Sequence, residues 1–153
     1  MPPTPDERYL ALALKEALAA FDEGEVPVGA IVVLGGQVIG RGHNRREALG
    51  DPTAHAELLA ITAAANHLGD WRLEGADIFV TKEPCPMCAG ALINGRLARL
   101  VFGAWDKQAG CCGSLYQLCR DPRFNHQLEV AGGIMEIECQ ELLQRFFRRR
   151  REG

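Results

Sequence analysis

The chain has 153 residues, 47% of them hydrophobic, which is enough for one compact domain with a substantial core. Its formal net charge of −3 and pI near 5.8 argue against a protein that coats nucleic acid or an anionic membrane through its overall field. Charged side chains interrupt the apolar run of residues 1–21, so neither a signal-peptide core nor a membrane span fits. We therefore expect a single domain, residues 1–153, that works in the cytoplasm without a membrane partner.

The first predicted elements are a helix and a hairpin. Thr4-Pro5-Asp6-Glu7 has the form of a capping box with proline at the first helical position, and apolar residues then recur at helical spacing until near Gly24. Two apolar runs, residues 30–34 and 37–41, flank Gly35-Gly36, which is typical of a hairpin with a two-residue turn.

A second helix is predicted after a polar loop, residues 42–52. Asp51-Pro52-Thr53 offers the cap and first turn of a helix that reaches about Leu68. His55 and Glu57 would then lie in the opening turns of this helix.

A strand, helix, strand unit follows. Residues 77–81 have the composition of a fully buried strand, Cys85 opens a short helix that ends near Asn94, and residues 97–104 form the next strand. Such a unit normally makes a parallel pair through a right-handed crossover.

Residues 105–126 show an irregular pattern with turn signals and room for one short helix. Cys111 and Cys112 lie in this region, and neighbouring cysteines can form only a strained disulfide. We expect buried or oxidation-prone thiols there, with a second metal site as the lesser alternative. In a chain with no export signal, all six cysteines are more often free or metal-bound than disulfide-bonded.

The chain ends with a short strand, residues 128–130, and a helix over residues 136–151. The apolar side of that helix consists of Leu142, Leu143, Phe146 and Phe147. Together the elements predict an α/β fold, a three-layer α/β/α sandwich around a mixed sheet of about five strands.

Cys85, Cys88 and His55 are the candidate ligands of a metal ion. If Cys85 caps its helix and Pro86 takes the first helical position, Cys88 lies on the same face and both sulfurs can reach one metal. His55 and Glu57 are two residues apart, so both can reach that metal only if their helix points at it end-on. Three protein ligands leave one tetrahedral position free, as in a catalytic zinc site.

Each half of this pattern has an ordinary alternative. A Cys-x-x-Cys pair is often half of a structural zinc site or a redox pair, and a histidine near a helix start is often a capped polar residue. A structural site would need a fourth strong ligand, and the sequence has no second Cys-x-x-Cys. The joint pattern, His-x-Glu followed by Pro-Cys-x-x-Cys, resembles the signature of the zinc nucleobase deaminases. It favours hydrolytic deamination of a ring amidine, with Glu57 as the proton carrier.

Blocks along nearly the whole chain resemble the bacterial tRNA adenosine deaminase family, within the cytidine deaminase superfamily. They are residues 24–30, 43–45, 51–57, 80–81, 83–91, 101–104, 124–126 and 146–148. The zinc pattern alone would also fit deaminases of free cytosine, cytidine, deoxycytidylate or guanine, so the flanking blocks are what favour the tRNA enzyme.

The resemblance implies a cytidine deaminase-like fold and the conversion of adenosine to inosine at the wobble position of an arginine tRNA anticodon. It implies one Zn²⁺ per subunit on His55, Cys85 and Cys88, with Glu57 as proton shuttle. It also implies a homodimer in which the site for the tRNA anticodon stem-loop draws on both subunits.

Three base-contacting residues follow from the same resemblance. Asn44 should hydrogen-bond the flipped base, and Val26 and Ala56 would line its pocket. From the sequence alone, Asn44 could equally be an Asx-turn residue in a polar loop.

Four further residues are expected to contact the RNA around the base. Phe147 and Arg148 would belong to an RNA-contacting helix end, whose alternative is a solvated terminus with its phenylalanines in the core. Asp106 and Lys107 lie where the family contacts the anticodon loop. The competing functions are a deaminase of a free base or nucleoside and, more distantly, a non-enzymatic zinc module.

Overall fold

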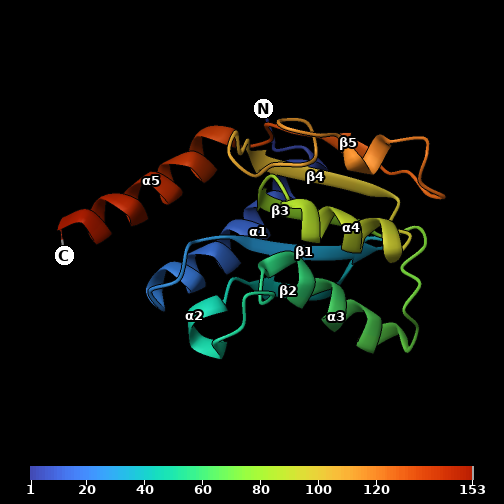
Figure 1. The fold of residues 1–153 in the computed structure, drawn as a ribbon, viewed down its shortest axis with the longest axis horizontal. Helices are drawn as coiled ribbons and strands as arrows, with labels where there is room; N and C mark the ends of the chain where they lie inside the picture. Colours follow the sequence, from blue (N-terminus) through green and yellow to red (C-terminus); the bar gives the residue numbers. More distant parts are fainter. Residues whose placement is uncertain (153) are drawn as a thin grey trace.

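The computed structural model describes residues 1–152, and its elements follow the order expected from the sequence (Figure 1). The helices are α1 (Pro5–Asp22), α2 (Arg46–Leu49), α3 (Ala56–Leu68), α4 (Pro86–Asn94), the 3₁₀ helix η1 (Leu118–Arg120) and α5 (Glu136–Glu152). The strands are β1 (Gly29–Leu34), β2 (Gln37–His43), β3 (Asp77–Lys82), β4 (Arg99–Ala104) and β5 (Glu129–Ala131).

The five strands form one mixed sheet in the order β2-β1-β3-β4-β5. β1 is antiparallel to both β2 and β3, and the β1/β2 hairpin turns at Gly35-Gly36 as predicted. β3 and β4 are parallel, with Val80 opposite Phe102, and β5 adds a second parallel pair. The sequence therefore predicted both the mixed sheet and the β3-α4-β4 unit correctly.

Helices cover both faces of the sheet (Figure 1). On one face α3 and α4 pack over a core that includes Ala60, Leu92 and Phe102. On the other face α1 and the start of α5 pack over Ile31 and Phe79. The three-layer prediction is confirmed, and the end of α5 extends beyond the sheet (Figure 1). No helix within residues 1–152 is long and apolar enough to cross a bilayer.

The start of α3 differs from the prediction, and local hydrogen bonds explain why. Asp51 does not cap the helix, because its Oδ1 accepts hydrogen bonds from the main-chain N and the Oγ1 of Thr53 at 2.8 and 2.7 Å. Such a side-chain turn competes with helix formation. The helix therefore begins at Ala56, with His55 as its extended N-cap residue.

The loop before α3 contains the short helix α2, which the sequence did not predict. Its first turn is held by Glu25, whose buried carboxylate accepts hydrogen bonds from Glu47 N at 3.0 Å and Ala48 N at 2.7 Å. Because Glu25 lies more than twenty residues before the helix that it caps, the sequence around α2 does not reveal the cap. It ties the loop after α1 to the loop after β2.

Two glycines of β2 face α3 and allow the helix to pack closely against the strand. A Cβ atom at Gly40 would collide with the main chain of Ala60, and one at Gly42 would collide with that of Ala56. This close packing sets the distance between the start of α3 and strand β2.

Candidate active site

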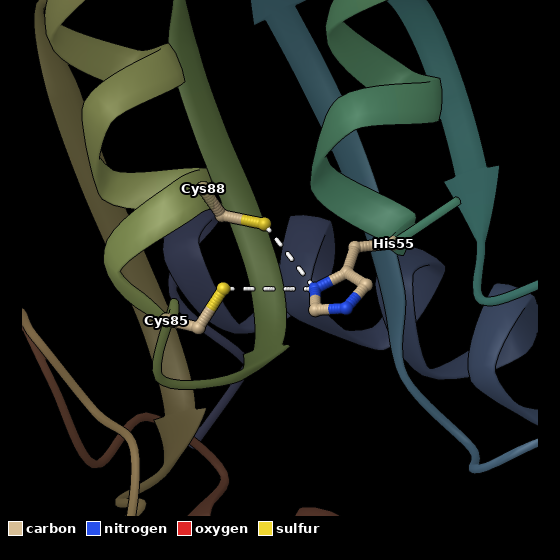
Figure 2. A group of neighbouring side chains, drawn as sticks. All are labelled: His55, Cys85 and Cys88. Carbon is tan, nitrogen blue, oxygen red and sulfur yellow. Dashed lines mark hydrogen bonds between the residues drawn. The ribbon is translucent and has the colours of Figure 1, made fainter. Parts of the chain in front are cut away.

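The side chains of His55, Cys85 and Cys88 converge on one point (Figure 2). Nδ1 of His55 lies 3.7 Å from Sγ of Cys85 and 3.5 Å from Sγ of Cys88. The three donor atoms all lie within 4.8 Å of one another, and no second such group occurs among residues 1–152. Within those residues the structure therefore lends no support to a second metal site at Cys111 and Cys112.

Two helix starts bring these ligands together (Figure 2). His55 is the N-cap residue of α3, and Cys85 is the N-cap residue of α4 with Pro86 in the first turn. Cys88 follows in the first turn of α4 and is fully buried. The end-on approach required by His55 and Glu57 is confirmed, and the positive ends of the two helix dipoles favour thiolates at this place.

The donor set fits a tetrahedral zinc ion. Bonds of about 2.3 Å to sulfur and about 2.05 Å to nitrogen, meeting at the tetrahedral angle, place the two donor atoms about 3.6 Å apart. The separations of 3.7 and 3.5 Å between His55 Nδ1 and the two sulfurs match this spacing. Imidazole and thiolate are also ligands that zinc prefers. The cluster is therefore consistent with a metal site that has three protein ligands.

The pKa values of the two thiols shift in opposite directions. A hydrogen bond from Cys88 and, after it, one with His55 lower the pKa of Cys85 to about 4, although burial opposes this shift. The same contact and burial raise the pKa of Cys88. The hydrogen bond with Cys85 also raises the pKa of His55. A lowered pKa favours the thiolate form of Cys85, which is the form that binds a cation.

Glu57 lies in the first turn of α3 and is only 4% exposed. Burial raises the pKa of its carboxyl group, although the neighbouring His55 acts in the opposite direction. Glu57 lines the same cavity as His55 and Cys85. A carboxyl group whose pKa is raised by burial beside a metal site has the properties of a general acid and base.

A cavity of about 320 Å³ opens over the metal site. It brings together most residues that the sequence predicted for the site: Val26, Asn44, His55, Ala56, Glu57, Cys85, Asp106 and Phe147. Two predicted residues, Lys107 and Arg148, are exposed and lie outside the lining. Cys88 is fully buried and does not line the cavity.

Sequence reasoning missed five residues that line the cavity: Val28, Arg46, Lys82, Glu83 and Ala109. Lys82 Nζ lies 3.2 Å from the Asp106 carboxylate. Burial opposes ionisation of Asp106, but the ion pair with Lys82 and the hydrogen bonds from Gln108 N and Ala109 N together outweigh it and lower the pKa of this carboxyl group. The position of Lys82 and Glu83 directly before the Cys-x-x-Cys segment was a signal that could have revealed them.

Asn44 is both a turn residue and a cavity residue. Its Oδ1 accepts a hydrogen bond from Arg46 N at 3.1 Å, which is an Asx turn, and its Nδ2 donates to Val26 O at 3.1 Å. A side-chain amide has a second N–H and a second lone pair on its oxygen. Asn44 therefore keeps one donor and one acceptor beyond its contacts with the loop.

Comparison with known proteins identifies the family. The model of the MafB19-like deaminase family matches residues 4–151. The chain is 51% identical over 149 residues to the tRNA-specific adenosine deaminase of Bacillus subtilis (strain 168), which covers 97% of this chain and 92% of that protein. This chain belongs to the tRNA-specific adenosine deaminase family.

Solved structures share the fold of this chain. A structure from a study of A-to-I editing by tRNA:A34 deaminases at the wobble position of transfer RNA has a TM-score of 0.85 and 44% identity, covering 88% of this chain and 98% of that chain. A Bacillus subtilis guanine deaminase has a TM-score of 0.64 and 35% identity, covering 67% of this chain and 66% of that chain. The cytidine deaminase-like fold predicted from the sequence is thereby confirmed.

Proposed function

We propose that this chain is a zinc-dependent enzyme that converts adenosine to inosine at the wobble position of a tRNA anticodon, an arginine tRNA, in the cytoplasm. The observation that carries the proposal is a three-ligand metal site and a buried carboxyl group on one cavity, in a chain 51% identical to a tRNA-specific adenosine deaminase. The reaction adds water at C6 of adenine and releases ammonia.

His55, Cys85 and Cys88 would hold one Zn²⁺ per subunit. When bound, zinc supplies a Lewis acid that makes water a nucleophile near neutral pH. Cys85 and Cys88 hold their sulfurs at the start of α4, and His55 presents Nδ1 from the start of α3. These three side chains would hold the ion beside the cavity that Glu57 also lines.

Glu57 moves the protons of the reaction. Its carboxylate takes a proton from the attacking water, gives it to N1 of the ring, and then carries a second proton to the departing amine at C6. The bond between C6 and the exocyclic amine breaks as the C6 carbonyl forms, so water and adenosine become inosine and ammonia. Burial suits Glu57 to this role because it raises the pKa of the carboxyl group, which makes the group a better proton acceptor.

Asn44, Val26 and Ala56 would bind the base. The remaining donor and acceptor of Asn44 match the edge of a purine, and Val26 and Ala56 give the cavity apolar walls. A cavity of about 320 Å³ is at the small end of ligand pockets, which suits one base flipped out of its stack.

The RNA around the base would meet Asp106 and Phe147 at the cavity and Lys107 and Arg148 outside it. Arginines bind phosphates and an aromatic ring stacks on bases, as in other single-stranded RNA sites. We also propose a homodimer whose anticodon stem-loop site draws on both subunits. Exposed aromatic residues, among them Trp71, Tyr116 and Phe124, provide surface of the kind that such an interface buries.

One assay tests this proposal. The purified zinc-loaded protein is incubated with a tRNA that carries a wobble adenosine, and separately with adenosine, cytidine and guanine. We expect inosine in the tRNA and no ammonia from the small molecules. Deamination of the small molecules alone would favour the second candidate, a free-base or nucleoside deaminase. The likeness of this chain to the solved guanine deaminase is the observation behind that candidate.

A further inference from the structure

Glu83 is a buried carboxyl group that the proposed mechanism does not use. Its side chain lines the cavity, and the residue is only 2% exposed. It lies at the start of the segment that leads from β3 to the metal ligand Cys85. A buried carboxylate is costly unless each oxygen is satisfied, so its partners indicate its role.

All four hydrogen-bond donors to Glu83 come from one segment, residues 105–117, which follows β4. Oε1 accepts from Asp106 N at 2.9 Å and from Ser114 Oγ. Oε2 accepts from Cys112 N at 3.1 Å and from Ser114 N at 2.8 Å. A single side chain therefore organises an irregular segment that has little regular structure of its own.

Two further contacts show that the segment is built around Glu83. The carbonyl oxygen of Pro84 accepts a hydrogen bond from Cys111 N at 2.9 Å. Gly110 packs so closely that a Cβ atom there would collide with the Glu83 carboxylate. The three main-chain N–H groups and the hydroxyl all donate, so they match the carboxylate of Glu83, which only accepts. A glutamine at this position would turn its NH₂ group toward N–H donors, and two donors cannot bond to each other.

The segment held by Glu83 forms one wall of the cavity. Asp106 and Ala109 both line the cavity. The carboxylate of Asp106 accepts hydrogen bonds from Gln108 N at 3.0 Å and Ala109 N at 3.2 Å, and pairs with Lys82 at 3.2 Å. The main-chain N–H of Asp106 donates a hydrogen bond to Glu83. Glu83 therefore fixes the position of this wall.

We propose that Glu83 is a positioning residue, which holds the Asp106 wall of the cavity where the RNA substrate binds. This inference rests on the proposed function, because the wall is assigned to RNA. Glu83 acts through Asp106 and does not contact the reacting atoms. Its loss should therefore weaken substrate binding more than it slows the chemical step.

The test compares Glu83→Gln with the wild type and with the matched surface variant Glu74→Gln, which removes the same charge from an exposed site. Hydrogen exchange comes first, because it needs no substrate. In Glu83→Gln we expect the amides of Asp106, Cys112 and Ser114 to exchange at least about tenfold faster, because glutamine offers one acceptor oxygen in place of two, turns its NH₂ group toward N–H donors and so loosens the segment. Unchanged exchange at these amides would overturn the proposal.

Kinetics on an anticodon stem-loop separates positioning from a merely structural role. For Glu83→Gln we expect KM to rise about 10- to 100-fold, kcat to stay within about threefold, and zinc to stay near one per chain. In an Asp106→Ala background the same change should raise KM less than about twofold, because the two residues act as one unit. Additive effects, or a fall in kcat with KM unchanged, would overturn the proposal.

Ser114→Ala covers the case in which Glu83→Gln does not fold. It removes one donor and leaves the main-chain bonds to Glu83 in place, and we expect KM to rise about threefold or more. An unchanged KM would count against the proposal. If the wild type itself does not act on tRNA, the proposed function fails instead, and hydrogen exchange still decides whether Glu83 holds the segment.

Discussion

Nδ1 of His55 lies 3.5 Å from the sulfur of Cys88, although 33 residues separate them in the chain. The contact joins the start of α3 to the start of α4, two helices that pack on the same face of the sheet. A metal ion held at this place would cross-link two separate parts of the fold. Its removal should therefore affect stability as well as activity.

We expect a chelator to abolish activity and to lower the melting temperature by about 5–10 °C. A ligand that saturates its site a hundredfold above its Kd adds about 2.7 kcal/mol, and about 1 kcal/mol shifts the melting temperature of a domain of this size by about 2–4 °C. Calorimetry before and after chelation measures this change. Zinc should restore both properties and magnesium neither.

The ligand variant Cys88→Ala should reduce zinc from about one ion per chain to below about 0.1, measured by elemental analysis. Cys139→Ala is the matched control, because Cys139 is an equally buried thiol that packs on the opposite face of the sheet. Full zinc content in Cys88→Ala would contradict the ligand assignment. Loss of zinc in both variants would indicate unfolding, which circular dichroism detects.

Glu57→Gln should keep its zinc and lose about 10²- to 10⁴-fold or more in kcat, which corresponds to about 3–5 kcal/mol of barrier. The amide fills the same space in the first turn of α3 but cannot carry a proton. Single-turnover measurement of inosine formation, together with the zinc content, checks both parts. Activity within tenfold of the wild type would contradict the role of Glu57.

The sequence predicted the sheet, the order of its helices and the metal ligands, because these depend on periodicity, caps and short motifs. It misplaced the start of α3 because Asp51 had two local options, a helix cap or a turn with Thr53, and only the surrounding structure decides between them. Glu25 and Glu83 escaped prediction because their hydrogen-bond partners lie more than twenty residues away.

Asn44→Asp separates the two roles of Asn44. Aspartate can still accept the hydrogen bond from Arg46 N, but it loses the amide donor that reaches Val26 O and would reach the base. We expect kcat/KM to fall about 10- to 100-fold in both Asn44→Asp and Asn44→Ala. If Asn44→Asp retained wild-type kcat/KM while Asn44→Ala did not, Asn44 would act only as an Asx-turn residue.

The affinity for RNA should weaken as salt rises, because bound RNA releases counterions. Arg148 is exposed near the end of α5, so Arg148→Ala should raise KM and reduce the slope of log KM against log salt by about 0.7, the loss of one phosphate contact. Arg8→Ala, in the exposed first turn of α1, is the control and should leave the slope unchanged. Equal slopes for Arg148→Ala and the wild type would support the solvated-terminus interpretation.

Gly40→Ala tests whether the close contact between β2 and α3 sets the position of the site. The added methyl would meet the main chain of Ala60, so α3 must move away from the sheet, and we expect a loss of about 1–3 kcal/mol in the free energy of unfolding. Gly90→Ala is the control, because a Cβ atom there meets nothing within 4 Å and alanine is the better helix former by about 0.5–1 kcal/mol. Urea titration measures the free energy of unfolding of both variants.

Because α3 carries His55, the displacement should also weaken zinc binding in Gly40→Ala, whereas the Gly90→Ala protein should bind zinc like the wild type. Normal stability and zinc affinity in Gly40→Ala would show that this packing does not position the histidine.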